Sequence, residues 1–392
     1  MWIICQIGAR EHYAVARALH QEGLLDSMIT DFWVRPDSVF GVVPVGRRLR
    51  DRYHSELQDA NVKFANGRIL GFEIWQRLVG LSGWEAILER NRIFQKFASG
   101  VVSTCGMPDD GSIFCYSYAA LGLFRQAKQA GWRTVLGQID PGPEEERIVM
   151  EEHERYSHLT SAWQPAPAAY WDRWREEVEL ADRIVVNSEW SRQCICKEGV
   201  AKKKLEVVPL VYEENAKGVA GGGSAPRLSQ RRHRRVFRVL FLGQINLRKG
   251  VGRLLDAMHL LRDESIELIL AGPSEIPVSA WQGNPSVHWV GPVPRSQVGR
   301  YYDDADVFIL PTLSDGYALT QLEALSHGLP VISSRNCGEA VTDGVNGIVL
   351  EDLEPETIAA GIQRASETEF SDVRPPTFGL VELAERLNSL IK

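Results

Sequence analysis

Short runs of apolar, often β-branched residues alternate with longer amphipathic stretches along most of the chain. The runs lie at residues 3–7, 112–118, 134–139, 183–187 and 205–210, and then at 237–243, 266–271, 287–290, 307–311, 330–333 and 347–350. This alternation is typical of parallel sheets whose strands are joined by crossover helices. The pattern therefore predicts the α/β class, with one sheet in each half of the chain.

Three segments depart from the alternation and suggest how the chain is divided. Residues 215–235 contain GVAGGGSAP followed by RRHRR and have no core pattern, so we interpret them as a linker between a first domain over 1–214 and a second over 236–370. A mostly helical stretch predicts an insertion at about residues 40–100 of the first domain. Residues 371–392 predict a final helix, a candidate to pack back on the first domain.

Composition and charge narrow the class of protein. The 392 residues suffice for two domains, and a formal net charge of -7 gives no overall electrostatic reason to bind nucleic acid. The 6 cysteines lack metal-ligand spacing. The apolar start is too short to span a membrane and lacks a basic region before it, so we expect a cytoplasmic protein. Arginines at 47–52 and in RRHRR leave open peripheral contact with the inner membrane face, although a solvated helix face explains them more simply.

The densest chemical signal is VFILPTLSDGYALTQLEALSHGLPVISS. A buried strand ends there, and a loop with Asp315 leads into a helix predicted from about Ala318 to His327, in which Glu323 lies about two turns along. Because amides at a helix N-terminus favour phosphate, this loop predicts an anion cradle. Its backbone groups are those of Gly316, Tyr317, Ala318 and Leu319. Each carboxylate taken alone is explained as well by a cap or a solvated surface charge.

A second signal is FRVLFLGQINLRKGVGRLLDAMHLL, in which a strand ends at Gly243 and a short loop carries Arg248 and Lys249 before an amphipathic helix. The negative charge that develops on a leaving nucleotide diphosphate needs neutralisation, which lysine, arginine and helix dipoles supply. An isolated basic pair at a helix start is more often simply solvated. The two signals in one domain favour a ligand site.

Together these residues resemble the retaining nucleotide-sugar glycosyltransferases known as glycosyltransferase group 1 or family 4. Gly243, Lys249 and Gly250 fit the family pattern G-R-L-x-x-x-K-G, and the segment from Asp315 to Glu323 fits Glu-x7-Glu. VNSEWSRQCICKEGVAKKKLEVVPLVY is similar to the segment that closes the family's first domain, and QIGAREHYAVARALHQEG to its first strand, glycine loop and helix. The resemblance implies the GT-B architecture, two Rossmann-like doubly wound domains facing a cleft.

The resemblance also implies roles. Lys249 would bind the donor diphosphate, Glu323 the ribose hydroxyls, and Asp315 the transferred sugar. Gln244 stands where the family usually has arginine, so Arg248 is expected to supply that charge. Asp315 replaces the usual first glutamate, and Gln138 stands where many relatives carry histidine, so no role for a titrating imidazole transfers to that position.

The first domain is expected to bind the acceptor. Its glycine loop at Gly8 would face the diphosphate across the cleft, with Arg10 and His12 near the acceptor entrance, although a histidine early in a helix is more often packed or solvated. Gln138 and Asp140 follow a strand and are further candidates for acceptor contact. The acidic run after them is explained equally well by a solvated first helical turn.

The sequence thus predicts a hexosyltransferase-type glycosyltransferase of polysaccharide biosynthesis. It would move a sugar from a nucleotide diphosphate sugar to a glycan or lipid-linked acceptor with retention of configuration, without a cofactor and, lacking any Asp-x-Asp cluster on a strand end, without an obligatory metal. Another GT-B enzyme such as an epimerase or phosphorylase, and a non-catalytic subunit that binds a nucleotide-sugar, remain alternatives. A nicotinamide-dependent dehydrogenase fits poorly, because the opening lacks a full G-x-G-x-x-G.

Overall fold

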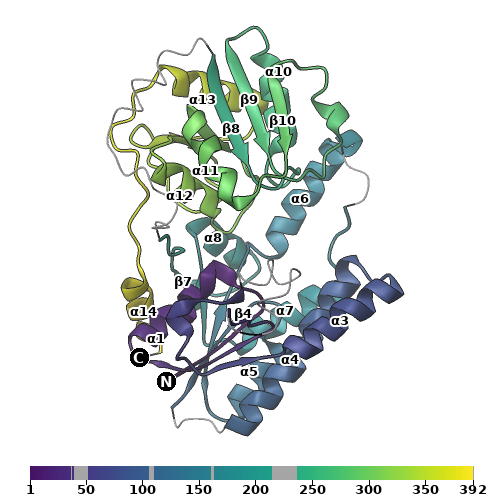
Figure 1. Ribbon diagram of the computed structural model, residues 1–392, viewed down its shortest axis with the longest axis vertical. Coiled ribbons are helices and arrows are strands. Elements are labelled where there is room, and N and C mark those ends of the chain that lie inside the picture. Colours follow the sequence, from purple (N-terminus) through teal and green to yellow (C-terminus); the bar gives the residue numbers. More distant parts are fainter. Residues whose placement is uncertain (37, 39–51, 106–109, 160–162, 214–235, 392) are drawn as a thin grey trace.

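Two parallel sheets, one above the other in Figure 1, organise the protein. The computed structural model describes residues 1–36, 38, 52–105, 110–159, 163–213 and 236–391. The expected linker and most of the arginine cluster at 47–52 lie outside these residues. Every strand pair in both sheets is parallel, which confirms the predicted α/β class with two separate sheets.

The first domain contains a seven-stranded sheet in the order β3-β2-β1-β4-β5-β6-β7. Its strands are β1 (Trp2–Gln6), β2 (Leu25–Thr30), β3 (Val62–Phe64), β4 (Ser112–Tyr116), β5 (Arg133–Gly137), β6 (Arg183–Val186) and β7 (Leu205–Val207). The central strands β1 and β4 are buried along their whole length, as expected where helices cover both faces of a parallel sheet. Neither β2 nor β3 was predicted from the hydrophobic pattern.

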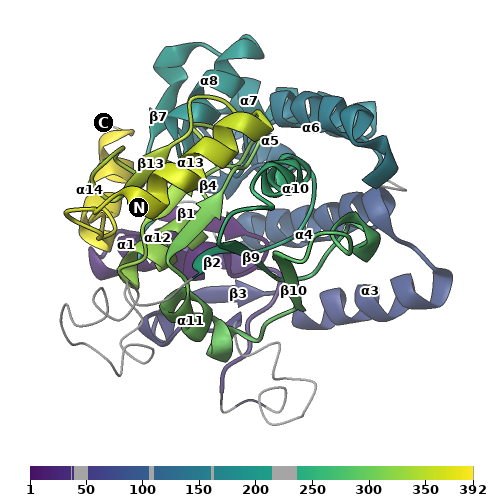
Figure 2. The ribbon, with the colours of Figure 1, turned by 90° about the horizontal axis from the view of Figure 1, so that it is seen from above.

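Helices cover both faces of this sheet. They are α1 (Ala14–Gln21), α3 (Asn66–Val79), α4 (Gly83–Cys105), α5 (Leu121–Gln129), α6 (Pro143–Arg155), α7 (Ala168–Leu180) and α8 (Glu189–Lys197), with single 3-10 turns η1 (Arg10–Tyr13), η3 (Ser55–Leu57), η4 (Ser157–Leu159) and η5 (Lys202–Lys204). The stretch predicted as a helical insertion does contain α3 and most of α4, but β3 lies between η3 and α3. Figure 2 shows α3 and α4 side by side at the edge of the domain.

The second domain contains a six-stranded sheet in the order β10-β9-β8-β11-β12-β13. Its strands are β8 (Phe237–Leu242), β9 (Ile266–Ala271), β10 (Val287–Gly291), β11 (Val307–Leu310), β12 (Val331–Ser333) and β13 (Gly347–Val349). Its helices are α10 (Val251–Leu260), α11 (Arg295–Asp304), α12 (Leu319–Ser326) and α13 (Pro355–Glu367), with the turn η6 (Val278–Ala280). One continuous apolar core fills the space between this sheet and its helices.

Two helices connect the domains. After the second domain the chain returns to the first, where α14 (Leu380–Ser389) packs on α1 and buries Leu383 and Leu387 in the first domain's core (Figure 1). Helix α6 makes the opposite connection, from the first domain to the second. It belongs to the first half of the sequence, yet Tyr156 and Leu159 just beyond its C-terminal end are part of the second domain's core.

None of the helices among the described residues is both long enough and apolar enough to cross a membrane.

Candidate active site

Two loops at the carboxyl ends of β8 and β11 are joined closely in the second domain. The backbone N–H of Leu313 donates to the carbonyl of Arg248 at 2.9 Å, and the hydroxyl of Thr312 donates to the same carbonyl at 3.2 Å. Gly250 lies against Pro311, since a Cβ at position 250 would stand 1.9 Å from the Pro311 carbonyl oxygen. This contact brings both predicted cations beside the loop that carries Asp315.

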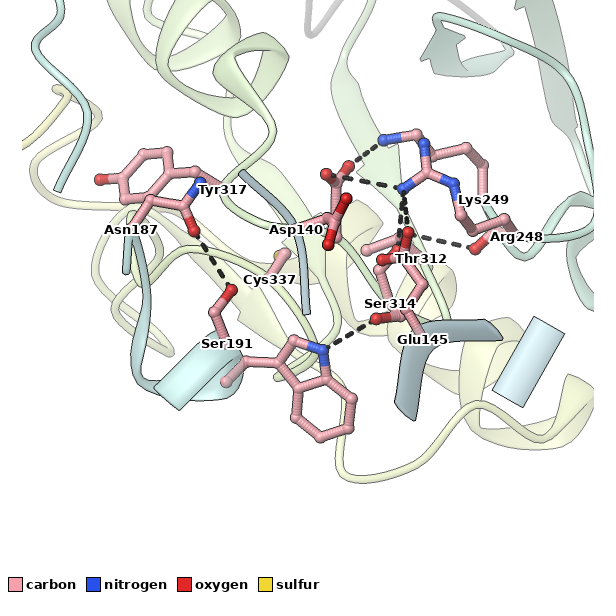
Figure 3. A network of polar contacts seen from close by, with 12 residues as sticks. Asp140, Glu145, Asn187, Ser191, Arg248, Lys249, Thr312, Ser314, Tyr317 and Cys337 are labelled. Atoms are coloured by element: carbon pink, nitrogen blue, oxygen red, sulfur yellow. Dashed lines mark hydrogen bonds and ion pairs between the residues drawn. The ribbon is translucent and has the colours of Figure 1, made fainter. Parts of the chain in front are cut away.

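The three charged residues predicted for this site form one cluster. Lys249 makes an ion pair with Asp315, and the Nη1 atom of Arg248 lies 3.7 Å from the other Asp315 oxygen (Figure 3). Arg248 also donates to the carbonyl of Ser314 at 3.1 Å. The side chains of Lys249 and Asp315 are only 15% and 16% exposed, so water screens their charges weakly. These loop contacts keep the cations facing the predicted anion cradle.

The predicted cradle directly precedes α12. Ala318 has a left-handed backbone (φ 63°) and caps the helix, which begins at Leu319, one residue later than predicted. Gln321 holds the loop by donating to the carbonyls of Tyr317 at 2.5 Å and Gly338 at 2.9 Å. Four successive backbone N–H groups have no hydrogen-bond acceptor among the described residues. They belong to Gly316, Tyr317, Ala318 and Leu319. Such amides are suited to receive an anion.

The remaining donor-side residues lie apart from the charged cluster. Glu323 is little more than one turn into α12 and not about two turns as predicted, and it accepts a hydrogen bond from the Tyr302 hydroxyl at 2.9 Å. No contact joins Glu323 to Asp315 among the described residues. Gly243 has the positive φ of 147° that glycine tolerates, and the Gln244 amide donates to Glu275 at 3.0 Å.

On the first domain, the Gly8 loop differs from the arrangement expected. The Gly8 amide donates to Asp31 at 2.8 Å and is thus already engaged. Asp31 is fully buried and also forms ion pairs with Arg90 at 2.7 Å and Arg52 at 3.4 Å. Arg52, taken from the sequence as part of a surface cluster, therefore helps to hold this loop together.

His12 was expected early in a helix, but it lies in η1, ahead of the first α-helix. Glu11, His12 and Tyr13 all have positive φ values of 49°, 49° and 62°, so the chain makes a left-handed turn before α1. This turn directs His12 to the other domain, where its Nε2 atom lies 3.1 Å from the Nη2 atom of Arg295. Arg10 is exposed, and its guanidinium carbon lies over the Tyr116 ring, 5.8 Å from the ring centroid.

Gln138 and Asp140 lie together after β5. The Gln138 amide receives a hydrogen bond from the Trp174 indole at 2.9 Å and donates to Asp140 at 3.1 Å. Asp140 also accepts a hydrogen bond from the Tyr118 hydroxyl at 2.5 Å, and burial raises the pKa of its carboxyl group. The Gln138 residue is only 3% exposed. Its hydrogen bond to Asp140 therefore positions that carboxylate.

A cavity of about 130 Å³ opens beside this pair at the carboxyl ends of β1 and β4. Aromatic rings and a few polar groups line it, among them Arg10, Asn91, Tyr116, Tyr118 and Tyr170. Tyr118 and Tyr170 stack with their ring centroids 4.6 Å apart. An apolar wall with a few polar groups is typical of a small-molecule subsite.

The two halves of the site meet at residues that the sequence did not single out. The Trp190 indole of α8 donates to the Ser314 hydroxyl at 3.0 Å, and Glu145 of α6 lies 3.6 Å from Arg248 (Figure 3). Gly316 faces Asn187, since a Cβ on Gly316 would stand 2.6 Å from its side-chain nitrogen. Glu145 belongs to a run of three glutamates whose members look alike in sequence. No local sequence pattern marks Trp190 or Asn187 as site residues.

The geometry just described can be compared with known proteins. Residues 236–368 match the protein-family model described as "Glycosyl transferases group 1". The match to this family model therefore covers most of the second domain. Amylovoran biosynthesis glycosyltransferase AmsK of Erwinia amylovora is 29% identical over 155 residues, which cover 36% of this chain and 38% of that protein. The chain spans about half the length, or less, of the first curated relatives it matches.

Solved structures extend the likeness to the whole chain. Sucrose-phosphate synthase from Thermosynechococcus elongatus gives a TM-score of 0.64 at 17% identity, covering 100% of this chain and 94% of that one. Anabaena Alr3699/HepE in complex with UDP-glucose gives a TM-score of 0.56 at 15% identity, covering 99% and 98%. At such identities the likeness concerns the fold, and the predicted GT-B architecture with two Rossmann-like domains is confirmed.

Proposed function

We propose that this protein transfers a hexose from a nucleotide diphosphate sugar to a glycan or lipid-linked acceptor, with retention of anomeric configuration. One observation carries the proposal. Lys249, Arg248 and Asp315 form a weakly hydrated charged cluster beside the four amides of residues 316–319, at the carboxyl ends of parallel strands. The UDP-glucose named for the Anabaena structure supports a nucleotide-sugar as the donor.

In the proposed reaction the donor diphosphate takes the place of Asp315 as the partner of Lys249 and Arg248. The bond between the anomeric carbon and the phosphate oxygen breaks as the acceptor hydroxyl bonds to that carbon on the same face. The departing phosphate receives the acceptor's proton. Fixed cations and amides stabilise the charge that develops on the phosphate, so the protein supplies position and charge instead of a nucleophile. Glu323 is proposed to hold the ribose.

The acceptor is proposed to enter the 130 Å³ cavity of the first domain, where Arg10 and Asn91 provide polar contacts and the lining residue Tyr118 is held by its hydrogen bond to Asp140. A lipid-linked acceptor is supported by the outer face of α3, which leaves Ile74, Trp75, Leu78 and Val79 between 48% and 81% exposed. Ile87 of α4 is 43% exposed and also lines the cavity, so the apolar surface continues to the acceptor subsite.

We further propose that this α3 face lies on the cytoplasmic surface of a membrane, with polysaccharide assembly as the process served. Arg68 and Arg77 are exposed at the borders of the apolar face and suit anionic headgroups. Five described cysteines are free thiols, as is usual in a reducing compartment. The proposal includes no metal or cofactor, because Lys249 and Arg248 supply the positive charge. Turnover unaffected by EDTA would agree with this.

The direct test is calorimetric titration of the protein with UDP, GDP, ADP and their glucose or mannose conjugates. We expect one nucleotide family to bind, Lys249→Ala to abolish that binding, and Lys128→Ala to preserve it, since Lys128 pairs with Asp182 outside the cluster. Folded wild-type protein that binds none of the nucleotides would contradict the proposal. With the donor identified, NMR of the product distinguishes retention from inversion, and turnover without an acceptor would indicate an epimerase.

A further inference from the structure

Helix α6 begins with three glutamates that have three different environments. Glu144 pairs with Arg147 at 2.8 Å and Lys197 at 2.7 Å. Glu146 accepts the indole N–H of Trp171 at 2.7 Å. Both therefore stabilise the first half of the chain, whereas Glu145 points across the domain boundary at the proposed donor site.

Glu145 shares one guanidinium group with Asp315. Arg248 Nη1 lies 3.6 Å from a Glu145 oxygen and 3.7 Å from an Asp315 oxygen, so it stands between a carboxylate of each domain (Figure 3). The Glu145 side chain is 16% exposed, and its Oε2 atom is buried without a hydrogen-bond partner among the described residues. Asp315 has Lys249 as a second cation, but Arg248 is the only cation paired with Glu145 among the described residues.

The backbone position of Glu145 is set by the anchoring of helix α6. At the other end of α6, Arg253 of α10 binds Glu152 at 2.7 Å, and the hydroxyl of Tyr156 donates to Asp256 at 2.7 Å. Helix α6 is therefore fixed to the same domain that carries Arg248. These contacts keep the Glu145 backbone on the side of the second domain that carries Arg248.

Several charged and titratable groups face Glu145 from the elements around it. They are Arg248 before α10, Asp315 after β11, Asp140 after β5 and, on α8, Cys194. The pKa of Glu145 is raised to about 8: burial is the largest cause and Arg248 opposes it, while Asp140 and Asp315 add to the rise and the Ser314 hydroxyl lowers the pKa. A proton can therefore take the place of Arg248 as the partner of Glu145 near neutral pH.

We infer that Glu145 is a positioning residue for the donor: when ionised it holds Arg248 at the domain boundary, and when protonated it releases Arg248 to the donor diphosphate. The inference rests on the proposed function, namely that the cluster binds a nucleotide diphosphate. Donor binding then takes up a proton at Glu145, because the diphosphate removes its cation and adds negative charge nearby. Affinity consequently falls as the pH rises through the pKa of the free protein.

The test is calorimetry with UDP, GDP and ADP from about pH 7 to about pH 9, in buffers of different ionisation enthalpy. For one linked proton, we expect the wild-type Kd of the nucleotide that binds to rise about tenfold over this range, with proton uptake near pH 8. Glu145→Gln should bind with a pH-independent Kd close to the wild-type value at the lower pH, and without proton uptake. Glu145→Asp retains a carboxyl group and should retain the pH dependence.

Glu151→Gln is the matched control, because Glu151 lies on the same helix, is 61% exposed and pairs only with Arg147 among the described residues. It should behave as wild type. A pH dependence and proton uptake unchanged in Glu145→Gln would overturn the inference while leaving the proposed function intact. Wild-type protein that binds none of the three nucleotides would contradict the proposed function, and the inference with it.

Discussion

Gly250 shows how a single residue builds the donor side of the site. Its φ of 73° lies in the left-handed region, where it caps α10, and its α-carbon touches the backbone of Pro311 at the end of β11. A side chain is excluded on both counts. The glycine therefore allows the loop with Lys249 and the loop with Asp315 to approach each other.

Gly250→Ala should lower the free energy of unfolding by about 3 kcal/mol or more, because it combines left-handed strain with a backbone clash. Gly23→Ala is the control. Gly23 has a φ of 67° with nothing within 4 Å of an added Cβ, so it experiences the strain alone. We expect a loss of about 1 kcal/mol there. Equal losses in urea denaturation of both variants would contradict the role given to the Pro311 contact.

Tyr302 should affect donor binding through Glu323. The ring is buried, and its hydroxyl donates to the carboxylate proposed to hold the ribose. Tyr302→Phe removes this hydrogen bond and should weaken nucleoside diphosphate binding several-fold, with about 1 kcal/mol lost in stability. Thr134→Val removes another side-chain hydroxyl, which donates to the Leu180 carbonyl in the first domain, and should cost stability alone. Comparing the Kd values of the two variants separates the effects.

The residues of the candidate site were predictable from sequence where a motif fixes their spacing. They were not predictable where tertiary contacts alone bring a residue to the site. Lys249 and Asp315 lie 66 positions apart in the chain, yet both follow strands that proved to be neighbours, so parallel topology placed them together. Glu145 could not be distinguished from Glu144 or Glu146, because only the crossing of α6 to the second domain selects it. Gln138 was expected at the acceptor, and its contact with Trp174 is invisible in sequence.

At the scale of elements, the hydrophobic pattern predicted the strands that form apolar runs and missed the strands that do not. Strand β2 contains Asp26 and Ser27 within LDSMIT, and β3 has only three residues, so neither forms an apolar run. The left-handed turn at residues 11–13 was also missed, because Glu11 and Tyr13 are of types that rarely adopt positive φ. Local propensity gives no signal where tertiary packing imposes the conformation.

Helix α3 offers the prediction that belongs to this scale. If its outer face lies on a membrane, Trp75→Ser combined with Leu78→Ser should reduce flotation with vesicles of phosphatidylglycerol and phosphatidylethanolamine at least several-fold, since two large apolar side chains no longer insert. Nucleotide binding should not change. Met150→Ser removes a 41% exposed apolar side chain from α6 and serves as control. If the wild-type protein does not float with the vesicles, the proposed membrane contact is excluded.

At the scale of the molecule, the domains are joined by more than the chain between them. Helix α14 ties the end of the sequence to α1, and α6 is anchored in the second domain through Tyr156 and Arg253. Any opening of the cleft must therefore move α6 with the second domain or break its buried contacts. This coupling explains how Glu145, from the first half of the chain, is part of the proposed donor site.

Gly316 lies where the two domains approach each other closely, and it carries the prediction for the whole molecule. A Cβ there would lie 2.6 Å from the Asn187 side chain and 2.8 Å from the carbonyl oxygen of Ile139, so Gly316→Ala should hold the domains apart. We expect turnover to fall at least about tenfold, because the acceptor and donor halves no longer meet in a near-attack geometry. Nucleotide affinity, which depends mainly on the second domain, should change less.

Small-angle scattering provides the structural measurement for this prediction. Gly316→Ala should show a larger radius of gyration than wild type with saturating nucleotide, whereas Gly283→Ala, with nothing within 4 Å of its added Cβ, should match wild type. If turnover is lost while the radius of gyration is unchanged, the added methyl group acts on the diphosphate cradle and does not separate the domains. Unchanged turnover would mean that the contact between Gly316 and the first domain is not needed for transfer.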